Sequence, residues 1–198
     1  MFSEKFLNEI KYIIDKLNLN AIEQIVQLIL ELKQLKGRLF FLGVGGSAAN
    51  ASHAVNDFRK LVGIEAYSPT DNIAELTART NDEGWPTVFS NWLAVSHLTA
   101  QDMVFVLSVG GGDLERNISP NLIAALDYAK KKNSKIVGIL GRDGGYAAKR
   151  ADAYVLIPTV NVDHITPHAE AFQMVISHLI VTHPKLNAVT PKWESMAI

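Results

Sequence analysis

The sequence predicts a three-layer α/β/α sandwich built on a parallel β-sheet. Two observations lead to this prediction: short, continuous apolar runs recur along the chain, and amphipathic helical segments alternate with them. Strands of a parallel sheet are covered by helices on both faces, so they are apolar throughout. Four or five strands fit, and the runs are RLFFLG at 38–43, MVFVLS at 103–108, SKIVGIL at 134–140 and ADAYVLIP at 151–158.

Two helices are predicted ahead of the first strand. Apolar residues recur at helical spacing across 2–18, and a second stripe follows from a capping residue, Asn20, to about Leu35. These helices must pack on the domain or on a second subunit, because no strand precedes them. Further helices are predicted from Ser47, near 117–132, and from about Pro167 to Val181. We expect one domain over 1–198, with leading helices at 1–36, an α/β core at 37–183 and an irregular tail at 184–198.

Composition excludes several classes of protein. The chain has 198 residues with 19 basic and 20 acidic side chains, so its net charge of −1 gives no electrostatic reason to bind nucleic acid or an anionic membrane. The absence of cysteine excludes disulfides, cysteine-based metal sites and thiol catalysis. No apolar run has the length of a membrane span, and the first residues lack the apolar region of a signal peptide. We therefore expect a cytoplasmic protein without nucleic-acid or membrane partners.

Two glycine-rich turns follow apolar runs, at Gly43–Ser47 and at 108–113 (SVGGGD). Ligands of open parallel sheets bind beyond the carboxyl ends of the strands, and glycine lets the backbone approach an anion at a helix N-terminus. The first turn also matches the dinucleotide fingerprint, but the acidic residue it requires could only be Glu65 or Asp71, and neither follows a clear strand. The simpler alternative is that the glycines only form tight turns. We expect no nucleotide.

Two pairs of ionisable residues occur at helical spacing. His53 and Asp57 are four apart, and Glu170 and His178 are eight apart, so each pair shares a helix face. Each pair alone is also compatible with a solvated or core-edge position. If both helices line one cleft, the two histidines and two carboxylates suit a divalent metal such as zinc, or general acid–base catalysis.

Other polar residues receive simpler interpretations. His164 and His168 precede the last predicted helix and can approach the cleft, although the sequence favours the interpretation that they do not. Arg142, in the turn GRDGG, is interpreted as organising a loop or a subunit contact.

Several motifs in a fixed order resemble one family. They are GVGGSAANASH at 43–53, Asn81-Asp82 before GWPTVFS, LSVGGG at 107–112, VGILGRDGG at 137–145 and TPHAEAFQMVISHL at 166–179. Together they resemble the SIS (sugar isomerase) domain proteins, in particular the phosphoheptose isomerase group. This resemblance implies a flavodoxin-like sheet and isomerisation of sedoheptulose 7-phosphate, or a related sugar phosphate, to D-glycero-D-manno-heptose 7-phosphate through an enediol. It also implies a homotetramer with active sites between subunits, and zinc or another divalent metal.

The resemblance implies roles for individual residues. Asp57 and His178 would transfer protons, and the metal ligands would be His53, Asp57, Glu170 and His178. Substrate contacts would come from Val44, Gly45, Gly46, Ser47, Asn81, Asp82, Ser108, Val109, Gly110, Asp113 and Glu170.

The sequence departs from the family at both ends of the implied site. Asp57 stands where the family has Glu, and Glu170 stands where it has Gln. Val44 replaces an Asn, and the 108–113 loop lacks three hydroxyl groups and has Asp113 in place of a serine. A carboxylate at 113 would repel a phosphate unless it turns outward or is compensated by Arg116.

Two other functional classes stay open at this stage. One is a non-catalytic SIS module that binds a sugar phosphate or a partner protein, and the other is a nucleotide-dependent enzyme. The presence of acids at 57 and 170 together with both histidines favours catalysis. We therefore predict an isomerase.

Overall fold

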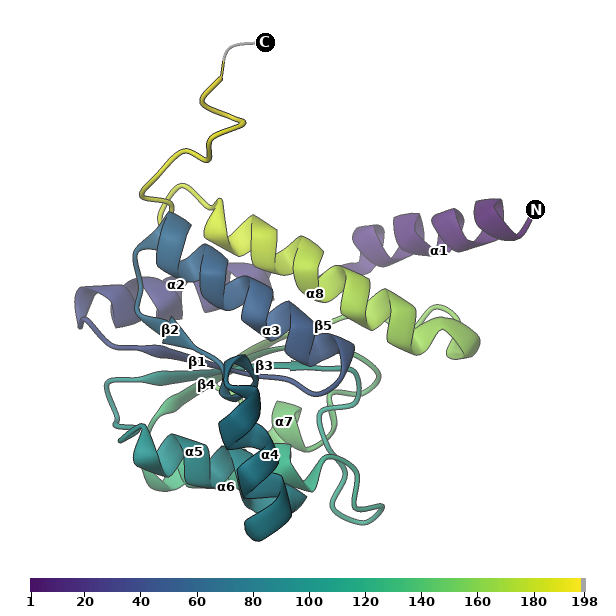
Figure 1. Cartoon of the computed structure of the whole chain (residues 1–198). Helices are drawn as coiled ribbons and strands as arrows, with labels where there is room; N and C mark the ends of the chain where they lie inside the picture. The colour runs from purple at the N-terminus through teal and green to yellow at the C-terminus, as the bar shows by residue number, and fades with distance from the viewer. Residues whose placement is uncertain (197–198) are drawn as a thin grey trace.

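The computed structural model describes residues 1–196 and has a five-stranded parallel sheet in the order β2-β1-β3-β4-β5, with helices on both faces (Figure 1). The predicted α/β/α sandwich and its flavodoxin-like strand order are confirmed. The strands are β1 (Leu39–Leu42), β2 (Ala66–Tyr67), β3 (Met103–Ser108), β4 (Lys135–Leu140) and β5 (Ala153–Leu156).

The helices occupy the segments between and around these strands. The α-helices are α1 (Phe2–Lys16), α2 (Leu19–Gln34), α3 (Gly46–Asp57), α4 (Ile73–Asp82), α5 (Val88–Val95), α6 (Pro120–Lys131), α7 (Gly145–Arg150) and α8 (Ile165–Val181). A π-helical turn, η1 (Phe58–Val62), continues α3, and the 3-10 turns are η2 (Pro69–Asp71), η3 (Trp85–Thr87) and η4 (Val162–His164). None of the helices among residues 1–196 is long and apolar enough to cross a membrane.

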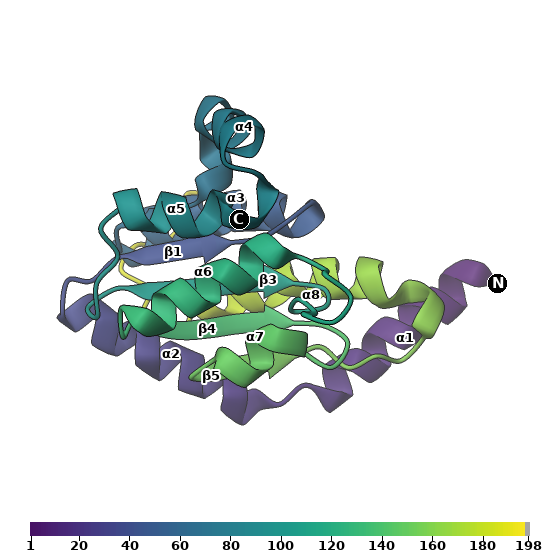
Figure 2. The ribbon, with the colours of Figure 1, turned by 90° about the horizontal axis from the view of Figure 1, so that it is seen from below.

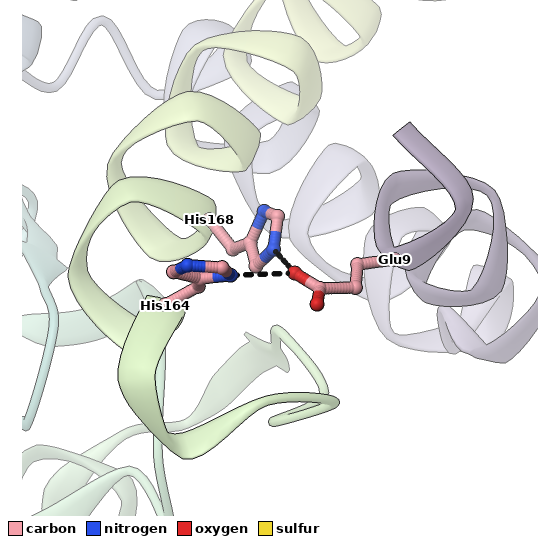
Figure 3. Close-up of side chains that lie close together, drawn as sticks. All are labelled: Glu9, His164 and His168. Carbon is pink, nitrogen blue, oxygen red and sulfur yellow. Dashed lines mark hydrogen bonds and ion pairs between the residues drawn. The ribbon is translucent and has the colours of Figure 1, made fainter. Parts of the chain in front are cut away.

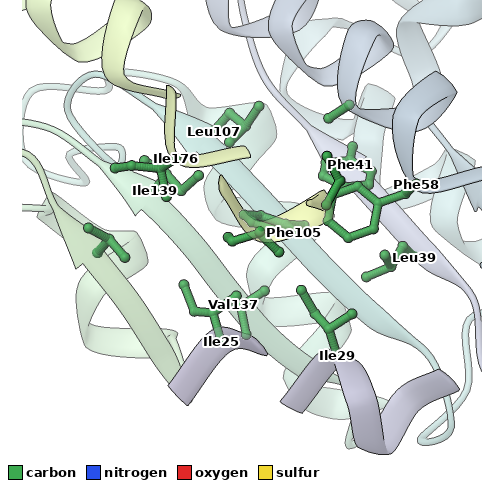
Figure 4. Packing of buried hydrophobic residues seen from close by; sticks show 14 of the residues in the cluster. Ile25, Ile29, Leu39, Phe41, Phe58, Phe105, Leu107, Val137, Ile139 and Ile176 are labelled. Carbon is green, nitrogen blue, oxygen red and sulfur yellow. The ribbon is translucent and has the colours of Figure 1, made fainter. Parts of the chain in front are cut away.

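Alternate residues of each strand point into two separate cores. Phe41, Phe105 and Val137 pack under α2, α3 and α8, and the Phe41 and Phe105 rings stack with their centroids 4.9 Å apart (Figure 4). Phe40 and Val104, the neighbouring strand residues, pack with α5 and α6 on the other face. Both faces are buried, which explains why the strands appear in the sequence as continuous apolar runs.

The two leading helices have different environments. Six residues of α2 are buried, and the helix packs on its own sheet beside α8. In α1 only Ile13 is buried, and Figure 2 shows this helix extending beyond the sheet beside the start of α8. The predicted cap at Asn20 is wrong: α2 begins two residues earlier, because Asn18 Oδ1 accepts a hydrogen bond of 3.2 Å from the backbone N–H of Ala21.

Three segments leave the simple alternation of strand and helix. The chain after β3 forms a small antiparallel bridge between Asp113 and Ile118, so α6 begins at Pro120, later than predicted. Helix α4 buries none of its residues and stands away from the sheet (Figure 2). The segment after α8 returns to the domain, because Leu186 is fully buried and the N–H of Ala188 donates to the Leu61 carbonyl.

Candidate active site

His53, Asp57 and His178 converge where the C-terminal parts of α3 and α8 lie side by side, and we call them the exposed triad. Asp57 Oδ2 lies 3.2 Å from His53 Nε2 and 3.4 Å from His178 Nε2, and the two ring nitrogens are 3.4 Å apart. Both histidine side chains are 52% exposed, whereas the Asp57 side chain is 11% exposed. The helices therefore bring together three of the four residues implied as metal ligands.

The spacing within the exposed triad is informative. In a tetrahedral zinc site with bonds of about 2.0–2.1 Å, neighbouring ligand atoms are about 3.3 Å apart. The three distances in this triad are 3.2, 3.4 and 3.4 Å. In addition, Asn56 Nδ2 donates to Asp57 Oδ1 at 2.9 Å, which leaves Oδ2 facing the histidines. The residues present therefore fit a divalent cation.

Glu170 does not join this group. Its carboxylate lies against the Cα of Gly46 at the other end of α3, where a Cβ on residue 46 would overlap it. Unpaired N–H groups and the helix dipole favour a carboxylate at this position. The eight residues from Glu170 to His178 make a little more than two helical turns and advance about 12 Å along the axis of α8. Glu170 therefore shares a helix face with His178, as expected from the sequence, but lies too far along the helix to reach the same ion.

A buried polar network fixes α3 against α8. Gln173, which is fully buried, donates from Nε2 to Ser47 Oγ at 3.0 Å and accepts from Asn50 Nδ2 at 2.9 Å. Asn50 Nδ2 also donates to the Glu170 carbonyl at 2.9 Å. These hydrogen bonds set the register in which Asp57 and His178 meet. Nothing in the sequence pointed to Asn50, whose partners lie about 120 residues away in the chain.

The two glycine-rich turns meet at a cleft at the carboxyl ends of β1 and β3, as predicted from adjacent parallel strands. The cleft has a volume of about 570 Å³, within the range of small-molecule sites. Gly45, with a φ of 65°, caps α3 beside it. The predicted substrate-contact residues that line this cleft are Val44, Ser47, Ser108, Val109 and Gly110.

The other predicted substrate contacts lie elsewhere. Asn81 and Asp82 are exposed at the end of α4, and the Asn81 amide donates to the Asp82 carboxylate at 2.7 Å. Asp113 turns into its own loop, where Oδ1 accepts from the backbone N–H groups of Glu115 and Arg116 at 3.0 Å. The Arg116 side chain lies 3.8 Å from Asp113 Oδ2. Asp113 is therefore both turned away from the cleft and compensated, the two conditions under which it would tolerate a phosphate nearby.

Arg142 also lines the cleft, although the sequence had suggested a loop or subunit contact. Its side chain passes over Gly110, and no ion pair joins it to an acid within residues 1–196. An arginine free of acidic partners, next to a glycine turn and two serines, provides a positive charge for an anion. Its place two residues after the end of β4 was the signal that could have revealed it.

A second group of the same residue types joins α1 to the start of α8 (Figure 3). Glu9 Oε2 lies 2.8 Å from His164 Nδ1 and 2.8 Å from His168 Nε2. Neither histidine is among the residues that line the cleft. We call these residues the inner triad. The sequence held a signal for Glu9: it shares the apolar stripe of α1 with Phe6 and Ile13, where an acid needs a partner.

Comparison with known proteins assigns the family. The family model of the SIS domain matches residues 4–141. The chain belongs to the SIS domain family. Phosphoheptose isomerase of Geobacter sp. (strain M21) is 32% identical over 168 residues, which cover 81% of this chain and 80% of that protein. Lincomycin biosynthesis protein LmbN of Streptomyces lincolnensis is 32% identical over 164 residues, and the match spans 59% of its length.

Solved structures agree with the fold of this SIS protein. Phosphoheptose isomerase GmhA from Neisseria gonorrhoeae superposes with a TM-score of 0.77 at 24% identity, over 91% of this chain and 94% of that chain. The sequence matches place the chain in the phosphoheptose isomerase group, and the predictions of family and of an isomerase enzyme are confirmed.

Proposed function

We propose that this SIS protein is an aldose–ketose isomerase that converts sedoheptulose 7-phosphate, or a related sugar phosphate, to D-glycero-D-manno-heptose 7-phosphate. The observation that supports it best is the convergence of Asp57, His53 and His178 from two helices at 3.2–3.4 Å. The names of the curated relatives support the substrate class.

The reaction moves a proton between neighbouring carbons. Asp57 removes a proton from C1 of the ketose while His178 donates one to the C2 oxygen, which gives the enediol. When the enediol collapses, the carboxyl group of Asp57 returns its proton to C2, and His178 takes the proton of the C1 hydroxyl. Both residues end in their starting protonation states, so one base and one acid complete the cycle.

The exposed triad also fits zinc or another divalent ion. His53, Asp57 and His178 would hold it, and Glu170 lies too far along α8 to be a ligand in this arrangement. Such an ion would occupy Nε2 of His178 and, when bound, would polarise the substrate oxygen in place of the proton from that histidine. Because Asn56 holds Asp57 Oδ1, the carboxylate keeps one oxygen aimed at the histidines.

The phosphate end of the substrate would bind in the glycine cleft. Ser47 and Ser108 provide hydroxyl groups, the turns provide backbone N–H groups, and Arg142 provides a positive charge. The cleft retains fewer hydroxyl groups than the family loop implies, and Arg142 offsets part of that loss.

A second copy of the chain would complete each site. Ser47 and Asp57 are ten residues apart on α3, so they are separated by roughly 15 Å along the helix axis. The cleft of one copy and the exposed triad of another can face the same substrate in a homotetramer. The exposed apolar residues of α1, including Phe2, Leu7 and Ile14, support subunit contacts by residues 1–36.

The test is an assay of the purified protein with sedoheptulose 7-phosphate, with NMR detection of the aldose product. It is run with added zinc and again after chelation, with oligomeric state measured in parallel. Turnover that depends on a divalent ion supports the proposal. No product from a folded tetramer under either condition would contradict it and favour a binding module.

A further inference from the structure

The inner triad lies apart from the exposed triad. On α8, His168 and His178 are ten residues apart, so the two histidine groups are separated by roughly 15 Å along the helix axis. Glu9 comes from α1, His164 from the end of η4 and His168 from the first turn of α8 (Figure 3). No step of the proposed reaction uses these residues.

The Glu9 carboxylate carries a largely buried negative charge. Its two oxygens have side-chain hydrogen-bond partners, with His164 and His168 at Oε2 and Asn161 at Oε1. Its side chain is 10% exposed, and no lysine or arginine pairs with it in the described part of the chain. The carboxylate is therefore available as an oxygen donor to a cation, together with the two ring nitrogens beside it.

Aromatic side chains shield the inner triad. The centroid of the Phe6 ring lies 4.6 Å from that of His168 and 5.3 Å from that of His164. The Phe2 ring meets the His164 ring edge-on, with the centroids 5.7 Å apart. Asn161 also fixes the orientation of the Glu9 carboxylate, because Asn161 Nδ2 donates a hydrogen bond to Glu9 Oε1 at 2.8 Å. A ligating carboxylate whose second oxygen is held by a hydrogen bond is typical of metal sites.

We infer that the inner triad is a second divalent-cation site, which takes a borderline first-row ion such as zinc. Two imidazole nitrogens and one carboxylate oxygen form a ligand set that zinc binds in proteins, with a fourth position left for water.

Binding requires only a small adjustment of the side chains. The ring nitrogens now lie 2.8 Å from Glu9 Oε2, at hydrogen-bond distance, and tetrahedral coordination needs about 3.3 Å between ligand atoms. A shift of about half an ångström is within the reach of the Glu9 side-chain torsions. The bound ion would fasten α1 to the start of α8.

The experiment counts ions in chains that lack the exposed triad. The background variant Asp57→Asn/His178→Gln is dialysed against zinc, and bound metal is measured by elemental analysis, with Co²⁺ absorption as a report of tetrahedral ligation. We expect the wild type to bind about two ions per chain, the background variant about one, and the background variant with Glu9→Gln none. Glutamine keeps the size of Glu9 and an oxygen that accepts from a histidine.

A matched control separates the inner triad from surface pairs. Glu23 Oε1 lies 3.3 Å from His183 Nε2, and this pair has only one histidine. Glu23→Gln in the background variant should therefore leave the ion at the inner triad in place. The inference is overturned if the folded background variant binds no ion, or if its ion survives Glu9→Gln. If the background variant does not fold, Glu9→Gln alone must lower the wild-type count by about one. Loss of isomerase activity in the proposed assay would not affect this count.

Discussion

Two groups of one carboxylate and two histidines lie along α8, and they differ in spacing and in access to solvent. In the exposed triad the three atoms are 3.2–3.4 Å apart and both histidines are half-exposed. In the inner triad the distances to the carboxylate are 2.8 Å, and the His168 side chain is 4% exposed. The exposed triad, which substrate can reach, therefore suits catalysis. The inner triad, which phenyl rings shield from substrate, suits a structural role.

The largest expected effect is the loss of activity on replacing the carboxylate of the exposed triad. Asp57→Asn removes the proposed base, so kcat for isomerisation should fall by about 1,000-fold. The thermal midpoint should change little, because the amide has the same size and can still accept a histidine N–H. Steady-state kinetics with NMR product detection and a thermal melt provide the two measurements.

Replacing the carboxylate of the inner triad tests whether the two triads have different roles. Glu9→Gln should keep kcat within about threefold of the wild type, because Glu9 lies far from the reacting atoms. If Asp57→Asn keeps full activity, or Glu9→Gln loses as much as Asp57→Asn should, the division of roles between the triads is wrong.

More of the fold than of the candidate site could be predicted from the sequence. Continuous apolar runs such as 38–43 marked buried strands, because both faces of the sheet are covered. The short strand β2 left no such signal, since it has two residues and Tyr67 is exposed. Helical spacing placed His53 beside Asp57, but it could not show that Glu170 lies against Gly46 while His178 joins the exposed triad.

Long-range partners explain the rest of the difference. Asn50 and Gln173 meet across 123 residues, and Glu9 meets His168 across 159. Local periodicity carries no information on such pairings, because it reports only which face of its own helix a residue occupies. The resemblance of motifs to the SIS family predicted that the residues of the exposed triad converge, but it did not predict the inner triad.

The next expected effect concerns the cleft. Arg142→Gln removes the positive charge beside Gly110, so the Kd for inorganic phosphate should rise about tenfold. Titration calorimetry measures the change, and Arg150→Gln is the control because Arg150 pairs with Asp127 and neither residue lines the cleft. Equal losses in both variants would mean that the cleft does not bind the anion through Arg142.

A smaller effect of opposite sign is expected from the acid between the two triads. Glu170→Gln removes a negative charge from the N-terminus of α3, so phosphate should bind about threefold more tightly. The same calorimetric titration tests this, with Glu115→Gln as a control on an exposed loop. Weaker binding in Glu170→Gln would show that the carboxylate helps to build the cleft instead of opposing the anion.

The smallest expected effect is a difference in acid stability. The pKa of Glu9 is about 2 in the folded protein against an ordinary value of 4.5, so its ionised form stabilises the fold above pH 4.5, and this contribution is lost as the pH falls towards 2. In metal-free protein, the unfolding free energy of Glu9→Gln should therefore fall less steeply over that range. Urea unfolding as a function of pH measures the slope, and identical slopes in both proteins would contradict the interaction.

The contact between Gly46 and Glu170 also limits how this sequence can change over evolution. A Cβ at position 46 would occupy the space of the Glu170 carboxylate, so a substitution there would force the end of that side chain to move away. A shorter residue at 170 would leave the same space free. The two positions, 124 residues apart in the chain, are thus expected to change together among descendants of this chain.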